Sequence, residues 1–445
     1  MSNALKTIAV DLTPVLPGGE NGGAKIFVLE LLSRLARLAP ETQFIFLTQA
    51  LSHSELKAME RKNISCVMVL GRAEKPRPLF AQLQTLLRKI PYFGRKFNTL
   101  IYRIVSLVKR RKASSLLCKL NANLLFCPFT APTYFEPGIP TVCTIYDLQY
   151  KTYPEFFSEE ERIQRNRTFT EACRNASMLT AISEYSRQSA IKHGKINPEK
   201  IRTIHLRMAH RILPKAVEDK SILNRLNLSA QPYLLYPANF WKHKNHEMLL
   251  TAFAIACQKN LASNIKLVCT GAVGSRQVWL AKAATMMNLG ERIIFPGFIT
   301  NGELALLMTN SRAVIFPSLY EGFGLPIIEA MAAGVPVACS NLCALPEIAG
   351  DAALNFNPRI PLQIADAILA LCTDEELRTR LINAGKERAK LFSDSSHMAE
   401  EYWHLFHQAL GLEIQEDEPL WRHELTNAPQ NNGESSEFIS TKNSA

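Results

Sequence analysis

The chain has 445 residues, of which 47% are hydrophobic and 20% are charged, and it carries a formal net charge of +11 with an isoelectric point near 9.1. This length and this apolar content exclude a small disulfide-stabilised scaffold and a fully disordered chain, and they predict two or three domains with real hydrophobic cores. The basic balance favours an anionic partner such as a nucleotide, a nucleic acid or an acidic membrane surface.

The ten cysteines are scattered along the chain and form no Cys-x-x-Cys pair. Several lie inside apolar segments, which indicates buried, reduced thiols and neither a disulfide framework nor a zinc site. No segment reaches the eighteen or so uncharged apolar residues of a spanning helix, and the N-terminal residues are typical of a first strand and not of a signal peptide. We therefore expect a cytoplasmic protein, peripheral on the inner face of the membrane if it contacts one.

Strand-like apolar segments alternate with helical patterns along most of the chain. The pattern begins at TIAVDL, continues through QFIFLT, PTVCTIYDL and ASMLTAIS, and restarts near Tyr233 with YLLYPAN, IKLVCTG, RIIFPGF and AVIFPS. Strands separated by helices predict βαβ units and parallel sheets. We therefore expect an α/β protein with two Rossmann-like, doubly wound domains that face each other across a cleft.

The predicted boundaries follow from the polar stretches between these segments. We expect a first domain at residues 1–212, a linker at 213–229 and a second domain at 230–395, followed by a helix at 396–412 and a disordered tail at 413–445. The tail is polar and poor in large apolar residues, which is typical of disorder.

Residues 72–119 interrupt the alternation. They contain one acid, Glu74, among many lysines and arginines that are interleaved with Leu, Ile, Phe and Tyr. A basic amphipathic segment of this kind suits an anionic membrane surface. Two other interpretations stay open. The segment could be a solvated insertion whose apolar face packs on the first domain. It could also bind nucleic acid, although no recognisable motif supports that function. We favour the membrane contact.

The stretch SLYEGFGLPIIEAMAAGVPV (318–337) places two glutamates, Glu321 and Glu329, around a turn rich in glycine. Pro326 suits the first helical position, so the pattern predicts strand, turn and helix. The free amides at that helix N-terminus suit a phosphate, and they belong to Phe323, Gly324 and Leu325. One glutamate on a ribose and another near a sugar fit a nucleotide-sugar. An ordinary helix start with solvated glutamates explains the residues about equally well.

Three further loops follow predicted strands and carry groups suited to an anionic or sugar ligand. Gly22 and Gly23 open a helix that contains Lys25, and a basic loop holds Lys242, His243 and Lys244. The third loop contains Tyr146, which can donate to a sugar hydroxyl, and Asp147, which can hold a cation or a hydroxyl. Each loop has a plain structural explanation, such as a turn cap for Asp147. Because doubly wound sheets bind ligands at the carboxyl ends of their strands, the shared placement is stronger evidence than any single loop.

Taken together, these segments resemble the GT-B glycosyltransferases of family 4, which include many mannosyl- and glucosyltransferases. The similarity is clearest over residues 230–358, where Glu321 and Glu329 look like the E-x7-E signature of that family and KHKNHEMLLTAFA looks like its phosphate-lysine segment. NGGAKIFVLELLSRL and IPTVCTIYDLQYKTYPEFFS look like the glycine loop and the central strand-end motif of the family.

The resemblance implies that Glu329 bonds the ribose hydroxyls and that Glu321 contacts the transferred sugar. The amides of Phe323, Gly324 and Leu325 would hold the distal phosphate or sugar hydroxyls. Lys244 would neutralise the leaving diphosphate. Glu321, Lys244 and Asp147 are thus the expected catalytic group, and Gly22–Gly23 would close over the diphosphate from the other domain.

Family members transfer sugars with retention of configuration and use neither a metal nor another cofactor, and the sequence contains no Asp-x-Asp motif. Two positions depart from the family pattern. Many relatives have an arginine a few residues before the phosphate lysine, and here Lys242 or His243 would have to replace it. Relatives also often have a histidine where Tyr146 stands.

The main hypothesis is a metal-independent hexosyltransferase that uses a nucleotide-diphosphate sugar, with GDP-mannose favoured over UDP-glucose, and a glycan or lipid-linked acceptor. One alternative is a non-catalytic basic α/β module that binds anionic membrane or nucleic acid. Another is a GT-B sugar-nucleotide epimerase, which would need no acceptor.

Overall fold

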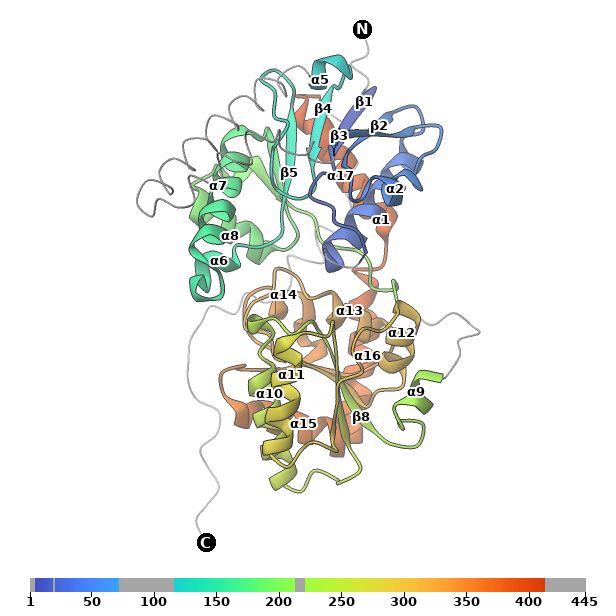
Figure 1. Cartoon of the computed structure of the whole chain (residues 1–445), viewed down its shortest axis with the longest axis vertical. Helices are drawn as coiled ribbons and strands as arrows, with labels where there is room; N and C mark the ends of the chain where they lie inside the picture. The colour runs from blue at the N-terminus through green and yellow to red at the C-terminus, as the bar shows by residue number, and fades with distance from the viewer. Residues whose placement is uncertain (1–4, 19–20, 72–115, 213–220, 413–445) are drawn as a thin grey trace, which may run out of the picture. The chain divides into compact units, whose positions relative to one another are not determined.

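The computed structural model of the chain describes residues 5–18, 21–71, 116–212 and 221–412. These residues contain two β-sheets, and all registered pairs of neighbouring strands in them are parallel (Figure 1). The predicted α/β class with two doubly wound parallel sheets is therefore confirmed. The boundaries between domains stay a prediction.

The first sheet has seven strands in the order β3-β2-β1-β4-β5-β6-β7. The strands are β1 (Thr7–Asp11), β2 (Gln43–Gln49), β3 (Ile64–Leu70), β4 (Leu124–Cys127), β5 (Thr141–Ile145), β6 (Met178–Ala181) and β7 (Ile201–Thr203). Strands β2 and β3 lie on one side of β1, and strands β4 to β7 lie on the other side. The carboxyl ends of β1 and β4 therefore flank a switch point, where ligands of such sheets bind.

The second sheet has six strands in the order β10-β9-β8-β11-β12-β13. The strands are β8 (Tyr233–Pro237), β9 (Lys266–Thr270), β10 (Ile293–Ile294), β11 (Ala313–Phe316), β12 (Val337–Ser340) and β13 (Ala353–Phe356). Its switch point lies between β8 and β11. Every residue of β8, β11 and β12 is buried, as expected for strands covered by helices on both faces.

Helices cover both sheets. Those longer than one turn are α1 (Gly22–Leu38), α2 (His53–Lys57), α7 (Glu159–Asn175), α8 (Glu184–Gly194), α9 (Ser221–Arg225), α10 (His246–Gln258), α11 (Ser275–Met286), α12 (Asn301–Thr309), α13 (Leu325–Ala332), α14 (Leu345–Ala349), α15 (Pro361–Thr373), α16 (Glu375–Lys390) and α17 (Ser395–Ala409). The single-turn helices α5 (Leu116–Lys119) and α6 (Gln149–Thr152) and four 3-10 turns complete the described elements, and α9 lies within the stretch expected to be a linker.

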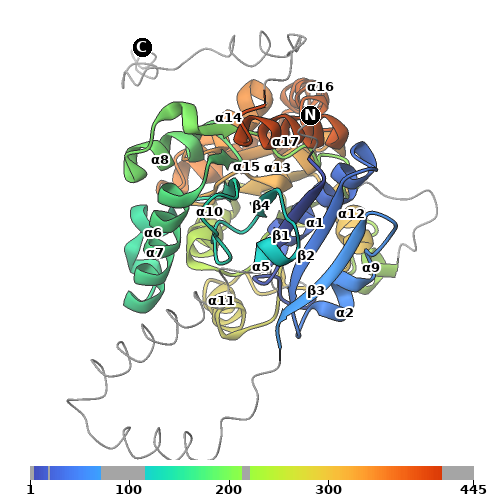
Figure 2. The ribbon, with the colours of Figure 1, turned by 90° about the horizontal axis from the view of Figure 1, so that it is seen from above.

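The last helix returns to the first sheet. In Figure 1 α17 lies beside α1, and Figure 2 shows the same part from above. The Tyr402 hydroxyl lies 3.4 Å from the Thr144 hydroxyl of β5 and 3.2 Å from the Thr180 hydroxyl of β6. The rings of Phe406 and Phe126 lie 5.1 Å apart. The sequence predicts this helix but not its partner, because the contacts join residues more than two hundred positions apart.

Two sequence predictions concern residues that the structure leaves undescribed. The basic segment expected at 72–119 lies outside the described residues except for α5, and the tail expected at 413–445 lies outside them entirely. Among the residues that are described, no helix has both the length and the apolar character that crossing a membrane requires.

Candidate active site

The loops after β8 and β11 meet at the switch point of the second sheet. The loop after β8 forms a 3-10 turn over Lys242–Lys244, and Asn245 follows with a left-handed φ of 61°. The Asn245 side-chain amide donates to the carbonyls of Pro317 (3.1 Å) and Pro358 (2.8 Å). These bonds fix the turn against the neighbouring loops, so that the position of Lys244 is set by buried backbone contacts.

Lys244 and Glu321 form a close ion pair. The Lys244 Nζ lies 2.5 Å from the Glu321 Oε1, and each side chain is 13% exposed. The Tyr236 hydroxyl donates to the Lys244 carbonyl at 2.6 Å, and this hydrogen bond fixes the backbone of the lysine. A largely buried ammonium beside a carboxylate can neutralise a leaving phosphate while the carboxylate accepts from a sugar hydroxyl.

The helix after the turn begins as the sequence predicts. Gly324 is the N-cap of α13 with a φ of 113°, and Pro326 occupies the first turn. A Cβ on Gly324 would lie 2.7 Å from the Leu345 side chain, so the position requires glycine. None of the amides of Phe323, Gly324 and Leu325 donates a hydrogen bond to another described residue. They are therefore available to oxygens of a phosphate or a sugar.

Glu329 lies in α13 and its side chain is 1% exposed. Its Oε1 accepts from Arg211 Nε at 2.7 Å and lies 2.6 Å from Arg211 Nη2. Burial raises the pKa of the Glu329 carboxyl, and the charge and hydrogen bond of Arg211 oppose that rise. The alternative interpretation of Glu329 as a solvated surface residue is therefore excluded.

The end of β5 touches the turn between β11 and α13. A Cβ on Gly322 would lie 2.3 Å from the Tyr146 carbonyl oxygen and 3.2 Å from the Asp147 Cβ. The Ser186 hydroxyl donates to the Tyr146 carbonyl (2.8 Å), and the Ser183 hydroxyl donates to the Gly322 carbonyl (2.7 Å). The structure therefore brings Asp147 beside the Glu321 turn, as the shared placement at strand ends predicts.

Asp147 and Tyr146 have different surroundings. Burial raises the pKa of Asp147, although its Oδ1 accepts from the Gln149 amide at 2.9 Å and Lys244 lies near enough to lower the pKa. The Tyr146 ring packs against Phe27 and Phe129, and its hydroxyl is buried with no hydrogen-bond partner among the residues that the structure describes. The hydroxyl expected to meet a sugar is thus inside the protein in this conformation.

The glycine loop also reaches the turn of α13. A Cβ on Gly23 would lie 3.1 Å from the Leu325 Cδ1, whereas Gly22, with a φ of 54°, faces open space. The N-terminal ends of α1 and α13 therefore lie close together, and both favour negative charge.

Lys25 does not join this group. Its Nζ donates to the carbonyls of Leu16 and Gly18, each at 2.9 Å, and lies 2.6 Å from the Glu55 carboxylate. These contacts use all three N–H groups and hold the glycine loop in place. Lys25 therefore has a structural role in this loop and has no N–H group left for a ligand.

The basic loop at Lys242–Lys244 carries fewer positive charges than its three basic residues predict. Burial lowers the pKa of His243 to about 4, so this ring is neutral near pH 7. Its backbone carbonyl accepts from the Leu319 amide at 2.7 Å, which is a structural contact. Lys242 is exposed at the same turn. If either residue replaces the arginine of the family pattern, Lys242 is the one that carries charge.

Glu347 is a residue that the sequence analysis missed. It lies in α14 and accepts from the first two amides of α8, those of Glu184 (2.7 Å) and Tyr185 (2.9 Å), and its Oε1 lies 2.7 Å from His205 Nε2. The same helix, α8, also contains Ser186, whose hydroxyl donates to the Tyr146 carbonyl. Glu347 therefore links α8, and through Ser186 the end of β5, to the second sheet. No local sequence pattern marks it, since its partners lie 142 to 163 positions away.

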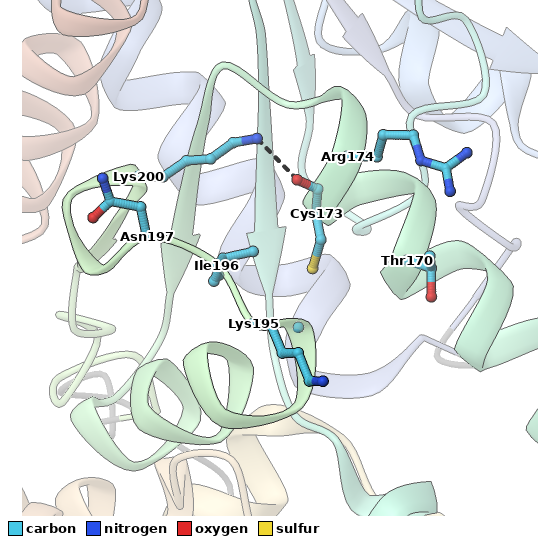
Figure 3. Close-up of a pocket in the computed structure, with 8 residues that line it drawn as sticks. Thr170, Cys173, Arg174, Lys195, Ile196, Asn197 and Lys200 are labelled. Atoms are coloured by element: carbon cyan, nitrogen blue, oxygen red, sulfur yellow. Dashed lines mark hydrogen bonds between the residues drawn. The ribbon is translucent and has the colours of Figure 1, made fainter.

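A cavity of about 350 Å³ lies elsewhere, at the C-terminal ends of α7 and α8 (Figure 3). It is lined by Thr170, Cys173, Arg174, Gly194, Lys195, Ile196, Asn197 and Lys200. The Lys200 Nζ donates to the Cys173 carbonyl at 2.8 Å. A cation at a helix C-terminus satisfies its free carbonyls, so these charges have a structural role. None of the predicted site residues lines this cavity.

Within the described ranges, no cluster of three or more His, Cys, Asp or Glu side chains is arranged to hold a metal ion.

Comparison with known proteins places these features in a family. Residues 219–388 match the family model described as glycosyl transferases group 1, and residues 21–206 match the one described as glycosyltransferase family 4. The O-antigen chain mannosyltransferase B of Escherichia coli is 30% identical over 253 residues, which are 57% of this chain and 66% of that protein. The serotype-specific mannosyltransferase WbdA of Escherichia coli is 28% identical over 275 residues, which are 59% of this chain and 33% of that protein. The matches thus cover just under two thirds of the first relative and one third of the second.

Solved structures share the fold. The sucrose-phosphate synthase of Thermosynechococcus elongatus superposes with a TM-score of 0.66 at 20% sequence identity, over 91% of this chain and 99% of that one. The two parallel sheets, the E-x7-E turn between β11 and α13 and the two family models agree with one another. The chain belongs to the GT-B glycosyltransferases of family 4.

Proposed function

We propose that this chain is a retaining hexosyltransferase that moves a sugar from a nucleotide-diphosphate donor to a glycan or lipid-linked acceptor. GDP-mannose is the favoured donor and UDP-glucose is next. The preference for mannose is supported by the names of the relatives, two of which are mannosyltransferases of Escherichia coli at 28 to 30% identity. In this proposal residues 1–212 form the acceptor side and residues 230–395 form the donor side.

The observation that carries the proposal is the cluster at the switch point of the second sheet. There the Lys244–Glu321 pair lies beside three unused amides at the start of α13, and the buried Glu329 follows within the same helix. Lys244 and the amides suit a diphosphate, Glu321 suits a sugar hydroxyl and Glu329 suits ribose hydroxyls.

The chemistry assigned to this cluster is attack by the acceptor oxygen on the same face of the sugar that the diphosphate leaves. The bond between the anomeric carbon and the phosphate oxygen breaks, and a bond from that carbon to the acceptor oxygen forms. The acceptor proton moves to an oxygen of the leaving phosphate. Lys244 and the amides of α13 stabilise the negative charge that develops on the diphosphate, which is the main electrostatic contribution.

Asp147 stands where an acceptor or donor hydroxyl would approach from the first sheet. Its position next to Gly322 supports a role in orienting that hydroxyl. In this proposal no metal or other cofactor takes part, because Lys244 and the helix N-terminus neutralise the leaving group.

The first test is thermal stabilisation of the pure protein by GDP, UDP, ADP and their sugar conjugates, with Glu329→Ala in parallel. A ligand that binds only the folded state raises the unfolding temperature by mass action. One nucleotide should stabilise the wild type and not the variant, and transfer to a mannan or lipid-linked glycan should proceed in EDTA. If no nucleotide stabilises the protein, the proposal fails and a non-catalytic basic module becomes the better interpretation. Isomerised donor without acceptor would instead indicate an epimerase.

A further inference from the structure

The Glu329 carboxylate is held from outside its own sheet. Arg211 belongs to the segment that follows β7 and leads toward the second sheet, and it lies 118 positions from Glu329. Two of its nitrogens, Nε and Nη2, meet the same oxygen, Oε1, at 2.7 and 2.6 Å. The other oxygen, Oε2, takes no part in this pair. Such an arrangement fixes one oxygen and leaves its partner free to accept other hydrogen bonds.

The guanidinium itself is anchored. The neighbouring side chains Met208 and Ile212 are buried in the core, and the Ala209 amide donates to the Phe392 carbonyl at 2.9 Å. The third nitrogen, Arg211 Nη1, donates to the Asn301 Oδ1 of α12 at 3.3 Å. The Arg211 side chain is only 16% exposed. Its position is therefore determined by the chain on both sides and by α12.

Arg211 also supplies the charge that this carboxylate needs. Burial alone favours the neutral form of Glu329, and Arg211 is the charged group whose interaction opposes it. A neutral carboxyl group has less capacity to accept hydrogen bonds than a carboxylate. Without Arg211, a carboxyl this deeply buried would be left without its counter-ion.

We propose that Arg211 is a positioning residue for the donor nucleotide, because it holds the Glu329 carboxylate so that Oε2 faces the ribose hydroxyls. This inference rests on the ribose role given to Glu329 in the proposed function. It adds a residue from the crossing segment to a site otherwise built from the second sheet. Arg211 acts through Glu329 and is not itself assigned a contact with the sugar.

The test compares nucleotides with and without ribose hydroxyls. Dissociation constants are measured for GDP and for UDP, each beside its 2′,3′-dideoxy analogue, on the wild type, Arg211→Gln and Arg211→Lys. In the wild type the accepted nucleotide should bind about 10- to 100-fold more tightly than its dideoxy form, because hydrogen bonds to a charged acceptor are lost in the latter. In Arg211→Gln this ratio should fall toward one. Arg211→Lys, which keeps the charge but not the paired nitrogens, should show an intermediate ratio, and it serves as the second variant if Arg211→Gln does not fold.

The matched control is Arg225→Gln. Arg225 pairs with Glu303 of α12 at 2.9 Å, and its side chain is 55% exposed, so its loss should leave the ratio unchanged. A merely structural role of Arg211 would weaken both nucleotides equally, and a retained ratio in Arg211→Gln overturns the inference. A further readout is pH. Burial already raises the pKa of Glu329 in the wild type, and removing Arg211 should raise it further, so the rise in nucleotide affinity as Glu329 ionises should shift to higher pH in Arg211→Gln.

The outcome also separates this inference from the function on which it rests. If the wild type binds a nucleotide but does not distinguish its dideoxy form, the ribose role of Glu329 is wrong and the inference about Arg211 is overturned with it, while donor binding stands. If no nucleotide binds at all, the proposed function fails as well.

Discussion

The Lys244 ammonium and the Glu321 carboxylate lie 2.5 Å apart although 77 positions separate them in the sequence. The pair is formed because β8 and β11 are neighbours at the switch point, so the loops that follow them meet. The Lys244 Nζ also lies over the Phe316 ring, 5.4 Å from its centroid, which places the positive charge over the end of β11. This arrangement presents one positive and one negative group to the same small volume.

The first prediction concerns the charge of Lys244. We expect Lys244→Gln to lower kcat by about 100-fold or more, because one preorganised group that stabilises developing charge contributes on that scale. The measurement is steady-state transfer from the sugar conjugate of whichever nucleotide stabilises the wild type. Lys242→Gln is the comparison on the same turn, and its effect should be smaller because Lys242 is exposed whereas Lys244 is largely buried beside Glu321. Equal losses in the two variants would mean that general basicity of the loop, and not the position of Lys244, supports turnover.

The second prediction concerns the contact between Gly322 and Tyr146. An added methyl group at Gly322 would lie 2.3 Å from the Tyr146 carbonyl oxygen, so Gly322→Ala has to displace the Glu321 turn or the end of β5. We expect at least a tenfold loss of activity with a folded protein, as judged by circular dichroism. Gly274→Ala is the control, since nothing lies within 4 Å of its added Cβ. Full activity of Gly322→Ala would show that the two loops do not need this contact.

The third prediction separates the ring of Tyr146 from its hydroxyl. The ring packs between Phe27 and Phe129, whereas the hydroxyl is buried and has no hydrogen-bond partner in the described part of the chain. Tyr146→Phe should therefore keep activity and be as stable as the wild type or more stable by about 1 kcal/mol, because an unsatisfied buried group is removed. Tyr236→Phe is the contrast: its hydroxyl donates to the Lys244 carbonyl at 2.6 Å, and its loss should cost about 1 kcal/mol and reduce turnover. A large loss of activity in Tyr146→Phe would show instead that the Tyr146 hydroxyl contacts the substrate.

The fourth prediction concerns the pH dependence of stability at Glu347. Burial alone raises the pKa of this carboxyl, but His205 and the two amides of α8 together lower it below its ordinary value of 4.5. A lowered folded-state pKa means that the stabilisation is fully present above pH 4.5 and is lost as the pH falls through the folded-state value. The difference in unfolding temperature between wild type and Glu347→Gln should thus be largest near pH 7 and shrink toward pH 3.

The control for Glu347 is an exposed carboxylate with a pKa lowered in the same direction. Glu375 is 69% exposed and pairs with Arg378 at the surface, so Glu375→Gln should change the unfolding temperature much less. If Glu347→Gln has the same small effect, the contact between α14 and α8 does not stabilise the folded chain.

The parts of the site that the sequence predicts are those determined by local backbone chemistry. Gly324 and Pro326 set the turn and the start of α13 through their own φ preferences, and the structure confirms both. Likewise, alternation of strands and helices predicts parallel sheets without knowledge of any contact, and that prediction is confirmed.

The rest depends on contacts that leave no local signal. Arg211 and Glu347 act on residues more than a hundred positions away, and each is an ordinary charged residue in its own segment. The direction of Tyr146 has another cause. All five residues of β5 are buried, so the strand shows no polar alternation from which the inward face could be read. For Lys25, the sequence places the residue near the loop, but only the structure shows that carbonyls and Glu55 occupy its N–H groups.

The return of α17 to the first sheet has a consequence for synthesis on the ribosome. Tyr402 and Phe406 complete the packing beside β4, β5 and β6, although those strands emerge more than two hundred residues earlier. The apolar surface that α17 covers is therefore exposed until nearly the whole described chain has been translated. A fragment that ends before Ser395 should retain that exposed surface and aggregate, whereas the same fragment with residues 395–412 supplied as a separate peptide should regain solubility. The two sheets are thus successive along the chain, but the first is finished last.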